Sequence, residues 1–125
     1  MSSSDPLSEH SLRHTRIWWL LGWCILGLIL VLSLMPSPPQ VGVVSDKWQH
    51  GFAYAVLMSW FAQLSPRHLK LSLLLVAMGI AVEFVQGWGG MRHFDVLDMV
   101  ANTIGVVFGW VLIRVGVNYL SWFEL

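Results

Sequence analysis

Polar side chains that could transfer protons or hold a cation recur in this sequence at helical spacing. Asp46 and His50 lie four residues apart, and Tyr54 continues the same interval. Glu83 and Gln86 lie three residues apart. Residues three or four apart share one face of an α-helix, so each group would face in one direction. Carboxylates and histidine can act as an acid, a base or a cation ligand, and these positions are therefore candidates for such chemistry.

A further polar stripe lies in the last apolar segment. Several polar and small residues fall within an arc of roughly 80° around that helix: Asp95, Asp98, Asn102, Gly105 and Gly109. The Gly105-x-x-x-Gly109 spacing permits the close approach of another helix, so the stripe should point into the protein. Helix capping is an alternative account of Asp95 and Asp98. Asn102 lies too deep to be a cap and needs a polar partner, because lipid offers none.

These polar residues stand out because the chain is otherwise apolar. Of its 125 residues, 56% are hydrophobic and 11% are charged, and the mean hydropathy is +0.66. Soluble domains carry about 25% charged residues, so the composition indicates a single membrane domain. The net charge of zero gives no indication of nucleic-acid binding. The single cysteine, Cys24, permits no internal disulfide.

The elements that position the polar residues are apolar runs. Four of them are long enough to cross a bilayer as helices: residues 17–35, 48–64, 69–85 and 96–117. The first carries no charge and covers roughly 28 Å, which favours a retained helix over a signal peptide. We therefore expect an all-α fold, a bundle of four transmembrane helices. Residues 1–16 would form a short cytoplasmic tail, and residues 17–125 the membrane domain.

Lysine and arginine are unevenly divided between the two ends of this bundle. One side carries most of them: Arg13, Arg16, Arg67, Lys70 and Arg114. The other side has Lys47 and Arg92. Because positive residues favour the cytoplasmic side, we expect both termini in the cytoplasm and a multi-pass protein of the cytoplasmic (inner) membrane. This orientation brings the polar residues to one depth at the outer face. We expect Arg92 and Asp98 to share a cavity there with His50 and Glu83.

Three stretches of the sequence resemble the VanZ-like family of small bacterial membrane proteins: DKWQHGFAY, EFVQ and RHFDVLDMVANTIG. The resemblance is strongest over residues 45–109. The positions that match the family pattern are Asp46, Lys47, His50, Tyr54, Glu83, Gln86, Arg92, Asp98, Asn102 and Gly105. His93 and Asp95 fit the pattern less clearly. The namesake of the family gives low-level resistance to teicoplanin, so the resemblance implies a role at the cell envelope and an effect on glycopeptide susceptibility.

One hypothesis is an outward-facing site that binds or processes an anionic, lipid-linked envelope molecule. Lys47 and Arg92 would hold the anion. The groups that could act as acid, base or metal ligand are His50, Glu83 and Asp98, and the remaining binding residues are Asp46, Tyr54, Gln86 and Asn102. The sequence contains no complete catalytic motif and no cofactor motif, so both binding alone and catalysis are compatible with it. Oxygen ligands of this kind would suit a divalent cation such as Mg²⁺.

Two other readings compete with this hypothesis. The polar groups could lock the bundle with hydrogen bonds, in a structural protein or one that binds a membrane-protein partner. A transporter or proton pathway is the other reading, because ionisable residues in membranes often mark one. However, the charged residues lie at one depth, and the half of the helices nearer the cytoplasm consists mainly of leucine, valine and isoleucine. A binding site predicts that neutral variants lose function while the protein stays abundant.

Overall fold

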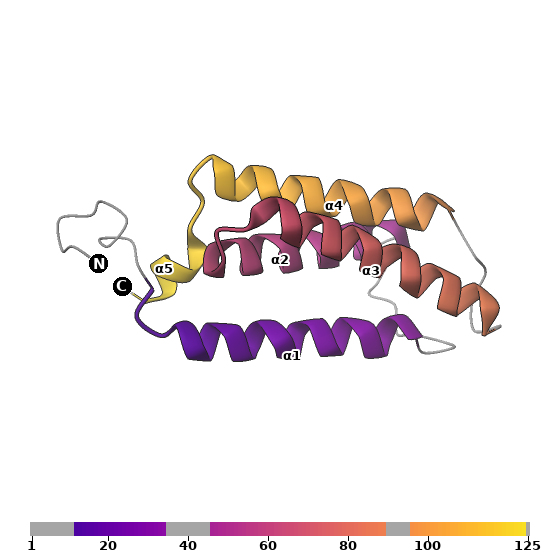
Figure 1. Cartoon of the computed structure of the whole chain (residues 1–125), viewed down its shortest axis with the longest axis horizontal. Helices are drawn as coiled ribbons and strands as arrows, with labels where there is room; N and C mark the ends of the chain where they lie inside the picture. The colour runs from indigo at the N-terminus through magenta and orange to yellow at the C-terminus, as the bar shows by residue number, and fades with distance from the viewer. Residues whose placement is uncertain (1–11, 35–45, 90–95, 125) are drawn as a thin grey trace.

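The computed structural model describes residues 12–34, 46–89 and 96–124, and for Asp46 and Lys47 it describes the backbone alone. These residues form helices and no strand. The helices, in chain order, are α1 (Thr15–Leu34), α2 (Asp46–Leu64), α3 (His68–Trp88), α4 (Val96–Arg114) and α5 (Tyr119–Phe123) (Figure 1). The prediction of an all-α fold is confirmed.

Two helix ends differ by three residues from the sequence-based expectation, and the other boundaries of α1 to α4 agree within two residues. α3 continues to Trp88 rather than ending at residue 85. α4 ends at Arg114 rather than continuing to residue 117, because the chain turns at Gly116, whose φ of 97° is unfavourable for other residues. The short helix α5 that follows this turn was not predicted.

By length and composition, three described helices are apolar enough to cross a membrane, namely α1, α3 and α4. α2 does not qualify, although four spans were expected. The reason lies in its polar residues, such as His50, Ser59 and Gln63, which lower the hydropathy of the helix. His50 and Ser59 are buried within the protein, so their polarity is directed away from the surroundings.

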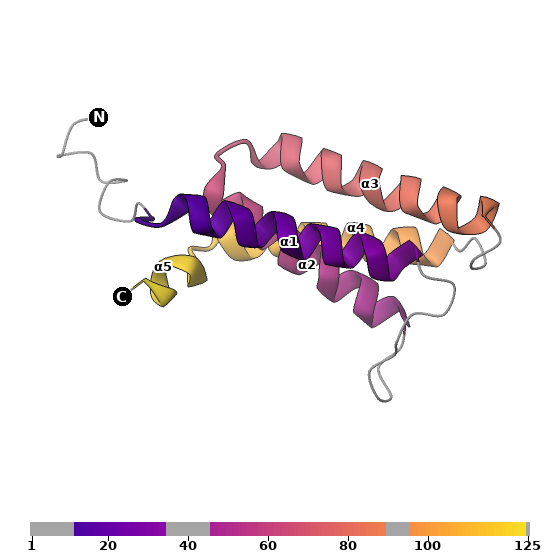
Figure 2. The same cartoon turned by 90° about the horizontal axis from the view of Figure 1, so that it is seen from below.

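α2 is the central helix of the fold. Its side chains supply most of the buried core, with Leu57 and Met58 fully inaccessible and Tyr54 and Phe61 nearly so. α2 contacts α1, α3 and α4. Figure 2 shows α1 running across α2 and α4, with α3 along one side. Because lipid is as apolar as leucine, such a core is stabilised in a membrane by close packing rather than by exclusion of water.

The closest packing joins α2 to α4. A Cβ atom added at Gly105 would overlap the backbone carbonyl oxygen of Gly51, and one added at Gly109 would lie 2.6 Å from the carbonyl oxygen of Ala55. The contacting residues advance together along both helices, so α2 and α4 run parallel. Both helices therefore begin at the same end of the molecule, where α1 and α3 finish; we call this the distal end.

The start of α1 and the segment that follows α5 meet at the opposite end of the molecule (Figure 1). The Glu124 carboxylate accepts hydrogen bonds from the backbone N–H groups of Arg13 (2.7 Å) and His14 (2.9 Å) and from Trp18 Nε1 (2.7 Å). Desolvation raises the pKa of this carboxyl, but the hydrogen bonds and the nearby His14 outweigh it and bring the pKa to about 2. An ionised carboxylate therefore holds the start of α1 against the C-terminal segment at neutral pH.

Candidate functional site

Buried polar side chains gather where α2, α3 and α4 approach one another toward the distal end. We call this group the polar cluster, and its members are His50, Glu83, Gln86, Asp98 and Asn102. Their exposed fractions are 9% for His50, 5% for Asp98, 2% for Asn102 and 0% for both Glu83 and Gln86. Each of the three helices contributes at least one member, so tertiary packing assembles the group.

The inner layer of the cluster is built around Gly79 of α3. A Cβ atom placed there would lie 3.0 Å from Asn102 Nδ2 and 3.4 Å from the Tyr54 hydroxyl. Asn102 and Tyr54 therefore meet over a position where the absence of a side chain makes room for them. This contact brings one residue from each of three helices to the same depth.

Helical geometry places three further residues in an outer layer, nearer the distal end. His50, Glu83 and Asp98 each lie four residues, or one turn, from the inner-layer residue on the same helix. Because α2 and α4 begin at the distal end and α3 finishes there, all three steps lead toward that end. Two carboxylates and an imidazole are thereby buried at one depth. Such groups can exchange protons with a ligand or with one another.

Gln86 connects the cluster to α1. Its side-chain Nε2 donates a hydrogen bond to the backbone carbonyl of Ser33. Ser33 lies in the last turn of α1, where carbonyl groups lack a partner within the helix. α1 is thus fastened at both ends, by Gln86 at the distal end and by Glu124 at the other.

Two buried oxygen atoms of the cluster retain capacity for a ligand. Among the described residues, no donor reaches Gln86 Oε1 or Asn102 Oδ1. A buried acceptor without a donor costs about 1–3 kcal/mol. A hydroxyl, an amine or a cation placed beside these atoms would recover that free energy.

Several predicted site residues lie outside the described parts of the chain. These are Arg92 with its neighbours His93 and Asp95, and the side chains of Asp46 and Lys47. The backbone of Asp46 and Lys47 forms the start of α2 at the distal end. Across the described ranges, no three His, Cys, Asp or Glu residues are grouped so that they could hold a metal ion. The divalent cation therefore stays a prediction.

Three features of this region were not predicted from the sequence. Gly79 carries no chemistry, and nothing in its sequence context indicates that Asn102 fills the space beside it. The Ser33 backbone carbonyl cannot be identified from a side-chain pattern. The inner half of the bundle also contains a polar contact, because the hydroxyl groups of Ser59 and Tyr119 lie 2.8 Å apart. Ser59 is buried, and this contact with Tyr119 was not predicted.

A family model described as VanZ/LLP1 matches residues 40–117 of the chain. This range contains α2, α3 and α4 together with every member of the polar cluster. Neither a curated protein nor a solved structure matches the chain.

Proposed function

The chain belongs to the VanZ/LLP1 family, and from this premise we propose that its polar cluster binds the anionic head group of a lipid-linked cell-envelope molecule. The observation that carries the proposal is the burial of two carboxylates and a histidine between helices of which two are apolar enough to cross a membrane. Ionisable groups in membrane helices are costly, by about 2.5–3.5 kcal/mol each at the centre of a helix and by less toward its ends, and they commonly mark a functional site. The open acceptors Gln86 Oε1 and Asn102 Oδ1 would accept hydrogen bonds from hydroxyl or amine groups of such a head group, and they support a ligand rather than a closed network.

The positive charge for an anionic ligand would come from Lys47 and Arg92. The described cluster contains two acids and one histidine, which alone would repel an anion. The planar guanidinium of arginine suits phosphate and carboxylate groups, and lysine adds a point charge. In this proposal His50, Glu83 and Asp98 hold or transfer protons at the head group. An effect on glycopeptide susceptibility follows when the envelope molecule occupies the site.

The proposal includes a topology. α2 forms a fourth span, because it runs parallel to α4 in backbone contact and therefore shares its depth. The distribution of lysine and arginine supports cytoplasmic termini, in the cytoplasmic (inner) membrane. The distal end, with the polar cluster, then faces the outside of the cell.

Cysteine labelling tests this topology at the two ends of α3. In a Cys24→Ser background, Trp88→Cys should react with a membrane-impermeant maleimide in intact cells, because Trp88 lies at the distal end and is 94% exposed. Ser65→Cys, just before α3 begins, should react only after permeabilisation. The reverse pattern would overturn both the orientation and the outward-facing site.

The alternative function is a structural one, in which the polar cluster locks the bundle for its own stability or for a membrane-protein partner. The hydrogen bond from Gln86 to the Ser33 carbonyl favours this reading, because it joins α3 to α1. The two functions differ in what happens when the cluster is disturbed without unfolding the protein. A structural lock predicts parallel losses of stability and binding, whereas a ligand site predicts a loss of binding alone.

Gly79→Ala is the variant that separates them. The added methyl group would lie 3.0 Å from Asn102 Nδ2 and 3.3 Å from Asn102 Cβ, so Asn102 must shift by a few tenths of an ångström, and we expect the fold to tolerate this shift. Alanine also improves helix propensity by about 1 kcal/mol over glycine. We expect an unchanged or higher melting temperature and about tenfold weaker binding of phosphatidic acid to the purified protein, measured by native mass spectrometry.

Gly27→Ala provides the matched control, because beyond the surrounding turns of α1 no described atom lies within 4 Å of a Cβ added there. It should leave the binding of phosphatidic acid unchanged. Diacylglycerol, which has no phosphate, should bind weakly to every form of the protein. Equal binding of the two lipids to the native protein would contradict selection of an anionic head group.

A further inference from the structure

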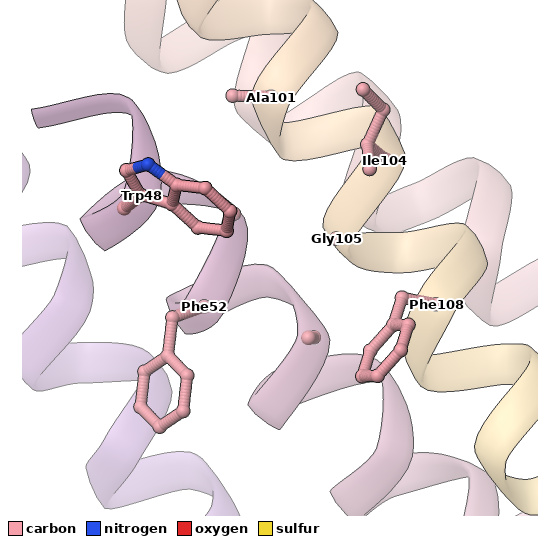
Figure 3. Close-up of a pocket in the computed structure, with 8 residues that line it drawn as sticks. Trp48, Phe52, Ala101, Ile104, Gly105 and Phe108 are labelled. Carbon is pink, nitrogen blue, oxygen red and sulfur yellow. The ribbon is translucent and has the colours of Figure 1, made fainter. Parts of the chain in front are cut away.

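An apolar groove runs between α2 and α4 at the depth of the polar cluster, with a volume of about 430 Å³. Figure 3 shows its two walls, formed by Trp48 and Phe52 on α2 and by Ile104 and Phe108 on α4. The floor is the contact between Gly51 and Gly105, where the backbones of the two helices meet. The volume lies within the range of about 300–1,000 Å³ that is typical of sites for small ligands.

We propose that this groove holds the hydrocarbon chain of the ligand whose head group binds the polar cluster. The inference rests on the proposed function and adds the class of ligand: a lipid that is bound by its chain and its head group together. A chain lying in the groove would be fixed against the same turns of α2 and α4 that carry the polar residues.

The adjacency of groove and cluster residues along both helices supports this assignment. On α2, Gly51 of the floor directly follows His50 of the cluster. On α4, Ala101 lines the groove and directly precedes Asn102. The two sites thus lie on neighbouring faces of the same helical turns. Since both helices begin at the distal end, a chain that follows the groove places its head group toward the end where the polar cluster lies.

The surroundings of the groove favour a hydrocarbon chain as its occupant. Trp48 and Phe52 are 76% and 73% exposed, so this wall faces the environment of the protein. α4 is apolar enough to cross a membrane, and its surroundings are then hydrocarbon. Helix association in lipid depends on small or polar residues at the contact. The small residues of this region are already in contact with each other, and bulky aromatic side chains form the rims, which disfavours a docked helix.

The groove follows α2 for about 10 Å between Trp48 and Ala55, roughly one third of the hydrocarbon thickness of a bilayer. A lipid would therefore be held by the part of its chain nearest the head group. The rest of the chain would extend into the surrounding lipid. The site should consequently select for the head group and for the width of the first part of the chain, and should accept chains of different length.

Photo-crosslinking tests the assignment directly. The full-length protein is reconstituted in phosphatidylcholine vesicles that contain phosphatidic acid with a diazirine in the upper half of one acyl chain. After irradiation, mass spectrometry should find the label on peptides from α2 and α4 that line the groove. The exposed face of α3 at Leu73 and Leu74 reports the background from bulk lipid.

Ala101→Leu fills the groove and should lower its labelling about tenfold. Ala77→Leu is the matched control, because Ala77 is an exposed alanine on α3 outside the groove. Phe52→Ala removes one wall without adding bulk and should lower labelling as well, whereas Leu73→Ala should not. Phe52 is largely exposed, so this variant keeps the test decisive if Ala101→Leu fails to fold.

The outcomes separate this inference from the proposed function. Groove labelling that stays at the native level in Ala101→Leu and Phe52→Ala would overturn the groove assignment, and head-group binding at the polar cluster would stand. Equal groove labelling by a neutral diacylglycerol probe would support the groove as a site for chains and overturn the anionic head group. Labelling of the groove no higher than that of α3 would mean that the groove contacts only bulk lipid, and would overturn the inference.

Discussion

Gly105→Leu is expected to separate α2 from α4 and to lower the melting temperature of the purified protein by roughly 4–12 °C. This range corresponds to an overpacking cost of about 1–3 kcal/mol in a chain of this size. The cost arises because a Cβ at Gly105 would lie 3.0 Å from the carbonyl carbon of Gly51 and 3.1 Å from its Cα, and would overlap its carbonyl oxygen. These are backbone atoms, so no rotation of a side chain can relieve the clash. The helices themselves must move apart.

The comparison for this variant is Gly27→Leu, the same exchange on α1. In the described part of the chain, no atom outside the neighbouring turns of α1 lies within 4 Å of a Cβ added at Gly27, so the larger side chain has room. Leucine is also a better helix former than glycine, and we expect an equal or slightly higher melting temperature. Similar losses of stability in the two variants would show that the protein tolerates no enlargement of a helical glycine, and would contradict a specific contact between α2 and α4.

This contact illustrates which part of the fold the sequence can predict. The Gly105-x-x-x-Gly109 spacing identifies a helix face suited to close packing, but it does not identify the partner. The partner face on α2 is Gly51 and Ala55, a pair with the same spacing that the sequence reading did not use. Pairing of two faces is a long-range property, and composition along one helix gives no information about it.

The number of membrane spans shows a similar limit. The sequence predicted four spans, but by length and composition α1, α3 and α4 qualify and α2 does not. α2 buries His50 and Ser59 against the other helices, and mean hydropathy cannot separate a buried polar residue from one that faces lipid. The C-terminal helix α5 was missed for a different reason. It has five residues, which is too short to show a helical period.

For the candidate site, helical spacing and the family resemblance named residues that the structure buries, among them His50, Glu83 and Asp98. The arrangement of these residues in layers required the fold, because it depends on how α3 is placed against α2 and α4. The space beside Gly79 and the bond from Gln86 to a backbone carbonyl also required it. Neither feature involves a pair of side chains that a motif could encode.

The second large effect is expected at the carboxylates themselves. Glu83→Gln and Asp98→Asn keep the size of each side chain and remove its charge. In the proposed site these buried carboxylates orient the cationic groups and hold protons at the head group, and this role outweighs their repulsion of the anion. We therefore expect each variant to reduce the binding of phosphatidic acid by more than tenfold, or about 1.4 kcal/mol. The amount of protein in the membrane should stay close to the native level, since a neutral amide is cheaper to bury than a carboxylate.

Glu124→Gln serves as the control for this pair. It also removes a carboxylate, but at the opposite end of the molecule, where Glu124 binds the start of α1. Its binding of phosphatidic acid should equal that of the native protein. If Glu83→Gln and Asp98→Asn were instead to disappear from the membrane, the polar cluster would be a structural lock, and the alternative function would be correct.

A double-mutant cycle with Arg92 then asks whether the charges act as one unit. Arg92 lies outside the described residues, and its place beside Glu83 is part of the proposal. In the proposed site the Arg92 guanidinium binds the anionic head group, and Glu83 keeps that guanidinium oriented. Arg92→Gln and Glu83→Gln should each remove most of the binding. The double variant should then be little worse than either single one, because groups of one network give strongly non-additive effects. Losses of binding free energy that simply add would show that Arg92 and Glu83 act separately, and a shared site would have to be abandoned.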